Sequence, residues 1–598
     1  MFRRALRSYE TPTLILRAFS LIISLLVVLN VVARYTYGFP LLIEGVLQII
    51  FSEVNRRKQA RRYRQYEQQS QDVEELGEEA SRRTECVGAV IGYREDPAIF
   101  RRCLESYRDD TSRAARVLVI GIDGNEAEDM QMIAMAEKVF GVENTPTIPL
   151  HEPFGQTATR MTSDWKRDRL EQKKGRDVSE DECHDHVLEV LVRQATSILQ
   201  DCGQLHHAPG RALQPICVCQ PHRSKKEIMF SSLLFTLALA RANSLPFIWS
   251  SDSDSILHTP AAPIHRVLAA MSADARIAGS CGALQIHNAA QSTVTRLVAA
   301  TYWTDLSLTS GQNSAFDVTD CQPGPCAAFR AAALASILVP WHAQTFLGAR
   351  PVVNEDRHLT TRLLLRGHKV TFNPSGTVLT DAPATLAAWV VQQVRWSRAI
   401  VLETLAHPRA LLVARSPVLA LYALRRVAGP YLQAWIVVRY LCAGRGTAVT
   451  SPADIAARIL LCSAYTLWRS RGGLGVAAAG GGGGSSARLW PWLVASQVFL
   501  QFPQPPIVFW ACATFLDGSW GSPVKCPPEK VEAVPRRAFR KNLAPLLCVA
   551  VWVALVGAAV AKYLAGVVFV GYGVERFCAS VGAMVAGSSM FYLLVCGY

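Results

Sequence analysis

The chain has 598 residues, half of them hydrophobic and only 18% charged, with a formal net charge of +14 and 16 cysteines. The cysteines are too few for a disulfide-based scaffold at this length, and we expect them to be reduced and mostly structural. The high apolar content favours a membrane protein. Because the positive charge lies beside the apolar runs, as the positive-inside rule describes, we expect a lipid bilayer as partner and no nucleic acid.

Two apolar runs open the chain, at residues 18–32 and 41–51, with a Tyr-Gly-Phe-Pro break between them. Arginines precede the first run and follow the second, which places both ends of the pair on the cytoplasmic side. A removed signal peptide would resemble the first run alone. We therefore expect residues 1–51 to form a transmembrane hairpin. Residues 52–84 are polar and charged, and we expect a surface helix or a charged linker there.

An alternation of strands and helices begins at residue 85. Apolar runs at residues 86–93, 116–123 and 247–254 predict buried parallel strands. Helical stretches lie between them, at residues 97–107 and 226–241. This alternation indicates an open, doubly wound α/β sheet. Residues 151–215 carry few strand signals and are expected to be an insertion or a long helical excursion.

Polar side chains follow several of these predicted strands. Tyr93, Asp123, Asp252 and Asp254 all lie at strand ends. Ligands of open α/β sheets bind at the carboxyl ends of the strands, so these residues should share one rim.

Asp252 and Asp254 are separated by one residue, and their carboxylates are hard ligands that suit Mg²⁺ or Mn²⁺. Such a cation stabilises charge on a departing diphosphate. Lys225, at a predicted helix start, is a candidate phosphate contact, although taken alone it is better explained as a solvated helix cap. The Cys217–Cys219 pair has His206, His207 and His222 nearby, but it lacks a second cysteine pair and does not predict a zinc site.

Two adjacent carboxylates, Glu355 and Asp356, begin a predicted helix. The helix dipole favours an ionised carboxylate at this end, and an ionised carboxylate is what a general base needs to take a proton from a sugar hydroxyl. A solvated helix end is the plainer interpretation of this motif when it stands alone.

A second motif follows at residues 392–396 and supplies an amide, a cation and an indole from Gln392, Arg395 and Trp396. The planar guanidinium of Arg395 suits a diphosphate. The indole of Trp396 suits the apolar face of a sugar. A base, a phosphate clamp and a sugar platform in one stretch predict glycosyl transfer.

Apolar segments return after the second motif, at residues 416–442, 454–468, 489–516, 543–570 and 577–597. A flexible glycine-rich linker occupies residues 472–487. Basic residues between 525 and 541 mark the cytoplasmic side, so residues 489–516 should begin and end inside. Prolines at 503, 505 and 506 interrupt that segment, which suits a re-entrant or interfacial helix pair. We expect residues 399–598 to combine interfacial helices with a transmembrane region.

Taken in order, these motifs resemble those of processive family 2 glycosyltransferases, and most closely the hyaluronan synthases and related fungal polysaccharide synthases. The resemblance covers nearly the whole chain and rests on GYREDP (92–97), IDGNEAED (122–129), SKKEIMF (224–230), DSDS (252–255), GPCAAFR (324–330), NEDRHLT (354–360), QQVRWS (392–397) and WGS (520–522). Chitin synthases more often have EDR and QRRRW at the equivalent positions, so the wording here favours hyaluronan synthase. The resemblance implies a cytoplasmic GT-A-like domain over residues 85–398 within an α-helical multi-pass membrane protein.

The resemblance also implies roles for the matching residues. It implies a nucleotide site made by Tyr93, Glu95, Asp123, Lys225, Asp252, Arg395 and Trp520. It implies a metal site at Asp254 and Asp252, and an acceptor site at Cys321, Gly324 and Trp396. It implies a catalytic group of Asp356, Glu355, Gln392, Arg395 and Trp396, in which Asp356 is the base.

One loop departs from the family pattern. A gating loop that closes over bound UDP-sugar commonly contains WGTSGR, whereas residues 520–525 here read WGSPVK. The arginine is missing, Pro523 should stiffen the loop, and Lys525 is a candidate substitute for the phosphate contact.

We therefore expect an inverting, processive enzyme of the plasma membrane that uses UDP-sugars with Mg²⁺ or Mn²⁺ and passes the growing polysaccharide through its own helices. The leading product is hyaluronan from UDP-GlcNAc and UDP-GlcA, and the runner-up is a chitin-like GlcNAc homopolymer. A transporter or channel with a regulatory α/β domain is the rival from another class, with slight support from Arg425 and Arg426. An inactive scaffold is a third possibility, but the acidic and Arg-Trp residues that it would have lost are present.

Overall fold

A computed structural model describes residues 41–74, 84–172, 180–207, 213–351, 353–412, 417–444, 452–470, 490–517, 535–568 and 581–582. Several expectations lie outside these residues: the first apolar run, the glycine-rich linker, the gating loop with Trp520, and nearly all of the last apolar segment.

A nine-stranded mixed sheet forms the centre of the fold, in the order β3-β4-β2-β1-β5-β8-β7-β9-β6. The strands are β1 Cys86–Gly92, β2 Ala115–Ile122, β3 Thr147–Pro149, β4 Gln214–Cys219, β5 Phe247–Asp252, β6 Ile256–Leu257, β7 Ile277–Ile286, β8 Ala327–Arg330 and β9 Lys369–Thr380. The five strands from β3 to β5 are all parallel, as expected for a doubly wound sheet. Beyond β5 the expectation is only partly right, because β8 runs antiparallel to both of its neighbours and β6 runs antiparallel to β9.

Apolar residues of the central strands alternate between two cores, one on each face of the sheet. Val87 and Ile91 point into one cluster with α8 (Lys225–Ala242), whereas Cys86 and Val90 point into the other with α4 (Pro97–Arg108). This two-residue period is the pleat of a strand buried on both faces. The helices around the sheet are α4 Pro97–Arg108, α5 Met130–Phe140, α6 Phe154–Gln172, α7 Glu180–Asp201, α8 Lys225–Ala242, α9 Pro263–Ser272, α10 Thr293–Thr301, α11 Ser307–Ser314, α12 Ala331–His342 and α13 Glu355–Leu365, with short 3-10 or π turns at Val142–Asn144, Thr259–Ala261 and Tyr302–Leu306. The expected helical excursion at 151–215 corresponds to α6 and α7.

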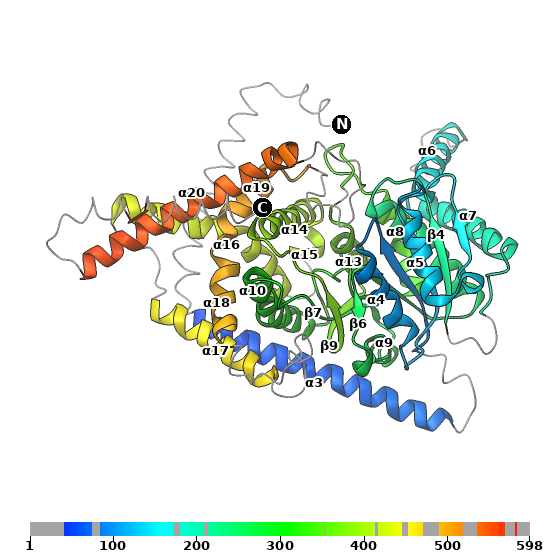
Figure 1. Ribbon diagram of the computed structural model, residues 1–598, viewed down its shortest axis with the longest axis horizontal. Coiled ribbons are helices and arrows are strands. Elements are labelled where there is room, and N and C mark those ends of the chain that lie inside the picture. The colour runs from blue at the N-terminus through cyan, green and yellow to red at the C-terminus, as the bar shows by residue number, and fades with distance from the viewer. Residues whose placement is uncertain are drawn as a thin grey trace.

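The helix α3, Leu41–Glu74, joins the apolar run and the charged stretch into one element. Residues 52–74 are therefore a helix rather than a loose linker, and one face of that helix is buried. Asn55 Nδ2 donates to the Phe372 carbonyl at 3.0 Å, and Arg62 pairs with Asp317 at 3.0 Å. In Figure 1 this helix runs beneath both the sheet and the C-terminal helices.

The C-terminal helices are α14 Leu386–Ala406, α15 Pro408–Leu412, α16 Pro417–Ala443, α17 Pro452–Ser470, α18 Trp490–Gln501, α19 Gln504–Ala513 and α20 Pro535–Val568. The segment 489–516 is broken between α18 and α19, at the prolines where the interruption was predicted. Within the described residues, one stretch, Leu543–Tyr563 of α20, is long and apolar enough to cross a membrane by length and composition. Figure 1 places α16, α18, α19 and α20 together on the side of the molecule away from α7.

Candidate active site

The carboxyl ends of β1, β2 and β5 open onto one cavity of about 1730 Å³. These strands are parallel neighbours, so their ends lie on the same edge of the sheet. Every sequence-predicted site residue that the structure describes lines this cavity, namely Tyr93, Glu95, Asp123, Lys225, Asp252, Asp254, Cys321, Gly324, Glu355, Asp356, Gln392, Arg395 and Trp396. Residues from seven separate motifs thus meet at one place.

Lys225 is the cation at the centre of this cavity. Its Nζ lies 2.8 Å from Asp252 Oδ1 and 3.3 Å from Glu355 Oε1. It is the first residue of α8, and the preceding Ser224 caps that helix by accepting from the Glu227 N–H. The interpretation of Lys225 as a solvated cap is therefore wrong, because its ammonium group pairs with two carboxylates inside the cavity.

Asp356 and Asp252 face each other across Gly324. The Gly324 N–H donates to Asp356 Oδ2 at 3.0 Å. A Cβ atom at Gly324 would lie 2.7 Å from Asp252 Oδ2 and 2.9 Å from Asp356 Oδ2. Only glycine leaves room for both carboxylates here.

Asp356 lies in the first turn of α13, which begins at Glu355 as expected. Burial, with the neighbouring Glu355 and Asp252 charges, raises the pKa of Asp356 to about 7, although Lys225 and the Gly324 N–H act in the opposite direction. The helix dipole favours the ionised form at this position, but loss of solvent acts against it. The carboxylate is instead poised near neutral pH.

A ring stack lies at the other end of the strand edge. The Tyr93 ring lies 4.0 Å from the His222 ring with an interplanar angle of 14°. His222 Nδ1 lies 2.9 Å from Asp123 Oδ2, and this contact raises the pKa of His222. Sequence reasoning considered His222 only as a zinc ligand and missed this position. Its signal was its place just beyond β4, at the same edge of the sheet.

Glu95 lies beside this stack and is nearly buried. Its carboxylate accepts from Ser253 Oγ at 3.0 Å and from the Asp96 N–H at 3.0 Å. Glu95 therefore ties the loop after β1 to the loop that carries Asp254.

The helix α14 contributes the second motif. Gln392, Arg395 and Trp396 line the cavity, and the Trp396 side chain remains 36% exposed. Burial lowers the pKa of Arg395, while Glu355, Asp356 and Asp252 favour its charged form. A charged guanidinium in the cavity wall can bind an anion through charge-assisted hydrogen bonds.

Residues 177–399 match the family model described as "Glycosyltransferase like family 2". Over these residues the chain is similar to a family 2 glycosyltransferase domain. The match ends just after the Arg395–Trp396 motif, and it includes Lys225, Asp252, Asp356 and Gly324.

Curated relatives point the same way. The chain is 27% identical over 317 residues to human Hyaluronan synthase 2, 27% identical over 317 residues to human Hyaluronan synthase 3, and 26% identical over 317 residues to Hyaluronan synthase 2 of Heterocephalus glaber. Each match covers 53% of this chain and 50% of the relative, so the chain spans about half the length of the curated relatives it matches. Among solved structures, the mannosyltransferase PcManGT from Pyrobaculum calidifontis in complex with GDP-Man and Mn2+ covers 75% of this chain and 98% of its own, at 10% identity and a TM-score of 0.33. A score this low supports no further argument.

The cavity of the glycosyltransferase domain holds a donor set that fits a divalent cation. Asp252 and Asp254 both line it at the end of β5. Two carboxylates are fewer ligands than Mg²⁺ or Mn²⁺ requires, so oxygens of a bound diphosphate and water would complete the shell. The residues present therefore fit a cation that arrives with a nucleotide.

Two arginines, Arg357 and Arg426, lie beyond Asp356, and the sequence-predicted site did not include them. Arg357 Nη1 lies 2.5 Å from Asp320 Oδ2, and Arg426 Nη1 of α16 lies 2.9 Å from the same oxygen. Although burial opposes it, these two cations hold the pKa of Asp320 below its usual range. Two arginines on one carboxylate leave net positive charge on this wall. Arg357 belongs to the Asn-Glu-Asp-Arg-His motif and was visible in sequence, whereas Asp320 carried no signal.

The same cavity continues from the glycosyltransferase domain into the helices around it. Its walls there include Gln48 of α3, Val437 of α16, Ile459 of α17, Leu500 of α18 and Val556 of α20. The region next to Asp356 and the space between these helices are therefore one continuous volume.

Proposed function

We propose that the chain is a membrane-embedded, inverting, processive glycosyltransferase that polymerises UDP-sugars. The observation that carries this proposal is the position of Asp356. It faces Asp252, Lys225 and Gly324 in a cavity that also contains the Arg395–Trp396 motif and extends between apolar helices. A base, an anion clamp and a path for product share one volume.

In the proposed reaction the acceptor hydroxyl attacks the anomeric carbon, the bond to the diphosphate breaks, and UDP leaves with the bonding electrons. Asp356 accepts the hydroxyl proton. A base is most effective when its pKa lies near the working pH, and a pKa of about 7 meets that condition. Arg395 and Lys225 would bind the diphosphate.

A divalent cation held by Asp252 and Asp254 would neutralise charge on that diphosphate. Tyr93 and Asp123 would bind the uridine at the far end of the strand edge, next to His222. Trp396, partly exposed in the cavity, would carry the acceptor sugar.

The surface of the C-terminal helices supports membrane embedding. Large apolar side chains are exposed on α3, α16, α17, α18, α19 and α20, among them Ile43, Leu47, Ile50, Trp435, Val438, Leu460, Trp468, Val498, Phe509, Val551 and Val560. Only 28% of the Leu543–Tyr563 window is buried. An exposed apolar surface of this extent is typical of contact with lipid. We infer that several of these helices lie in the bilayer of the plasma membrane with the catalytic domain in the cytoplasm.

The arginines beyond Asp356 favour an acidic product. A neutral chitin-like polymer offers no carboxylate for Arg357 and Arg426, whereas hyaluronan offers one per disaccharide. We therefore propose UDP-GlcNAc and UDP-GlcA as the substrates. The GlcNAc homopolymer remains the second candidate, because the site around Asp356 would serve it equally.

The test uses purified membranes supplied with each UDP-sugar alone and with both, followed by digestion of the product with specific hydrolases. We expect polymer only with the pair, and its removal by hyaluronidase but not by chitinase. Polymer from UDP-GlcNAc alone would favour the second candidate. Absence of UDP release with every sugar, together with solute flux across the membrane, would favour a transporter.

A further inference from the structure

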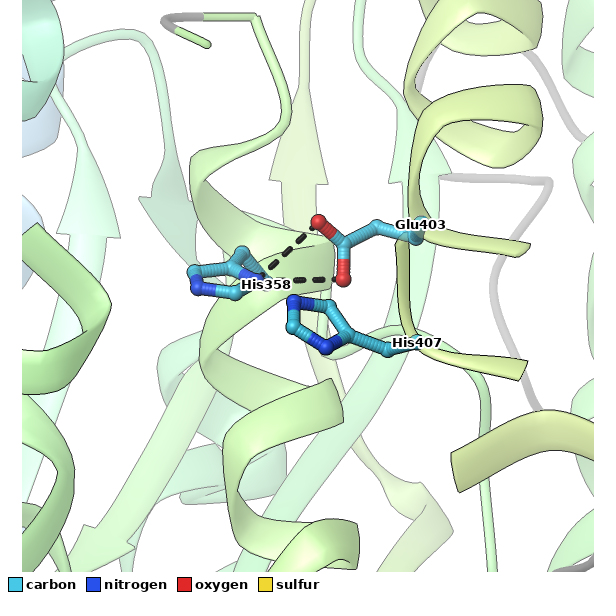
Figure 2. Close-up of side chains that lie close together, drawn as sticks. All are labelled: His358, Glu403 and His407. Atoms are coloured by element: carbon cyan, nitrogen blue, oxygen red, sulfur yellow. Dashed lines mark hydrogen bonds and ion pairs between the residues drawn. The ribbon is translucent and has the colours of Figure 1, made fainter. Parts of the chain in front are cut away.

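Three side chains behind the proposed base have ligand atoms within 4.8 Å of one another: His358 of α13, Glu403 of α14 and His407 just after α14 (Figure 2). His358 and Glu403 are completely buried. A group of this composition suggests a metal site, but its hydrogen bonds argue otherwise.

Both nitrogens of His358 are already engaged. Its Nε2 accepts from Arg362 Nε at 3.1 Å, so the ring proton lies on Nδ1, which is 3.1 Å from Glu403 Oε2. A metal ligand needs a free lone pair on nitrogen. The guanidinium of Arg362 and the buried Lys226 further disfavour a second cation nearby. Burial lowers the pKa of His358 to about 4, which keeps the ring neutral.

Glu403 also has a full set of donors. Gln344 Nε2 donates to its Oε1 at 2.8 Å, and Asn354 Nδ2 donates to the same oxygen. With His358 on the other side, three neutral donors converge on one buried carboxylate. Although burial opposes it, His358 and these donors lower the pKa of Glu403 to about 2. The carboxylate therefore stays ionised, as a group that accepts this many hydrogen bonds should.

Two of the donors to Glu403, Asn354 and His358, come from the start of the helix that carries Asp356. Asn354 is the N-cap residue of α13, but its side chain makes no capping bond and turns to Glu403 instead. His358 lies one turn further along α13. Asp356 lies between these two anchored positions. Glu403 itself lies seven residues after Trp396, which on a helix is nearly the same face, about 10 Å away.

We propose that Glu403 is a positioning residue that fixes the general-base helix α13 against the Arg395–Trp396 helix α14, and that the His358, Glu403 and His407 group is not a metal site. The inference rests on the proposed function, because it assigns Glu403 an effect through Asp356. Without the charge of Glu403, the buried hydrogen bonds that join the start of α13 to α14 weaken, and Asp356 is no longer held against the acceptor.

The experiment compares Glu403→Gln with His407→Phe in the full-length protein in membranes. Glu403→Gln keeps the shape of the side chain, but its own NH₂ group then faces at least one of the donors that the carboxylate accepted from. We expect kcat for UDP release to fall on the order of 10²-fold, the cost of a misplacement of about 1 Å. KM for UDP-sugar and the UDP dissociation constant should stay within about threefold, because the lost interaction acts in the transition state. His407→Phe should retain the wild-type rate, because His407 Nε2 has no hydrogen-bond partner among the described residues.

A milder variant keeps the test decisive if Glu403→Gln does not accumulate. Gln344→Met removes one donor only, and it should lower kcat by a smaller factor with the same unchanged KM. Metal analysis should find no stoichiometric ion that is present in the purified wild-type protein and absent from His407→Phe. Wild-type kcat in Glu403→Gln, a loss of UDP affinity in step with kcat, or a stoichiometric ion lost with His407 would each overturn the proposal. A wild-type protein without any transfer activity would instead overturn the proposed function.

Discussion

Asp356 and Glu355 are adjacent in the chain but contact different partners. Glu355 pairs with Lys225 and is almost fully buried, and its carbonyl accepts from Trp341 Nε1 at 2.9 Å. Asp356 contacts the Gly324 N–H and faces the cavity. Glu355 thus helps to hold the ammonium group of Lys225, which leaves Asp356 as the proposed base.

Asp356→Asn removes the proton acceptor while keeping the shape. General-base assistance contributes roughly 10²–10⁴-fold in rate, so we expect kcat to fall by that order while UDP still binds. Because the base must be ionised, wild-type kcat should rise with pH through about 7, and this limb should be absent from the variant. The measurement is UDP release between pH 5.5 and 8.5 beside UDP calorimetry. Loss of UDP binding with a retained rate would show that Asp356 belongs to the nucleotide site.

Asp254→Asn should abolish turnover without preventing membrane insertion, because it removes one of the two carboxylates at the proposed cation site. UDP affinity of the wild type should increase when Mn²⁺ is added, and the variant should not respond. Asp168→Asn, at an exposed carboxylate on α6, is the matched control and should behave as wild type. Full activity of Asp254→Asn in EDTA would refute the metal assignment.

Gly324→Ala tests the close approach of the two carboxylates. Its methyl group would lie under 3.0 Å from both Asp252 and Asp356, so one carboxylate must move. We expect a loss of kcat on the order of 10²-fold, as for other small displacements of reacting groups. Gly582→Ala is the control, because its Cβ would meet nothing nearer than 3.6 Å. Equal activity of the two variants would mean that the carboxylates do not act at this separation.

The sequence motifs identified the residues around the cavity because each motif is local. The motifs do not indicate which segments far apart in the chain contact each other. The stack of His222 on Tyr93, the pairing of Arg426 with Asp320 and the anchor at Glu403 each join segments far apart in the chain. The charge state of Asp356 was also beyond sequence, because it depends on how much solvent the assembled cavity excludes.

At the scale of elements, the strands β1, β2 and β5 and the start of α13 were predicted within two residues, because the apolar runs of these strands are long and their ends carry polar side chains. The parallel strands β3 and β4 were not predicted. The mixed order beyond β5 was not predicted, since short strands such as β6 and β8 carry little periodic signal. For the charged half of α3 the sequence left a surface helix and a linker open, and the helix is what forms. Several of its buried positions are polar, among them Asn55, Gln59 and Arg62, so the buried face carries little apolar periodicity.

The break between α18 and α19 belongs to the same scale and carries a prediction of topology. Two helices of 12 and 10 residues are each shorter than the roughly 20 residues needed to cross a bilayer. We expect this pair to stay on the cytoplasmic side, so that residues 525–541, which follow it, are cytoplasmic. A single cysteine introduced near Lys530 should therefore resist an impermeant thiol reagent in intact cells and react after permeabilisation. Labelling from outside would refute this arrangement.

At the scale of the whole molecule, one cavity joins the strand edge of the glycosyltransferase domain to the space between α3, α16, α17, α18 and α20. A polymer that grows at Asp356 would thus have a continuous volume ahead of it. Residues from both halves of the chain make its walls, so neither half alone encloses it.

The helix α3 limits how this protein can be divided into fragments. Its 34 residues make a rod of about 51 Å. Near its start, Asp454 of α17 accepts from the Leu41 N–H at 2.6 Å, and further along, Arg62 pairs with Asp317 and Asp274 beside the sheet. A fragment cut at the apparent domain boundary, residue 85, would leave Asp317 without Lys58 and Arg62, and the Phe372 carbonyl without Asn55. The half of the chain that forms the α/β sheet is therefore not a detachable module, and a fragment that contains it has to carry the charged part of α3.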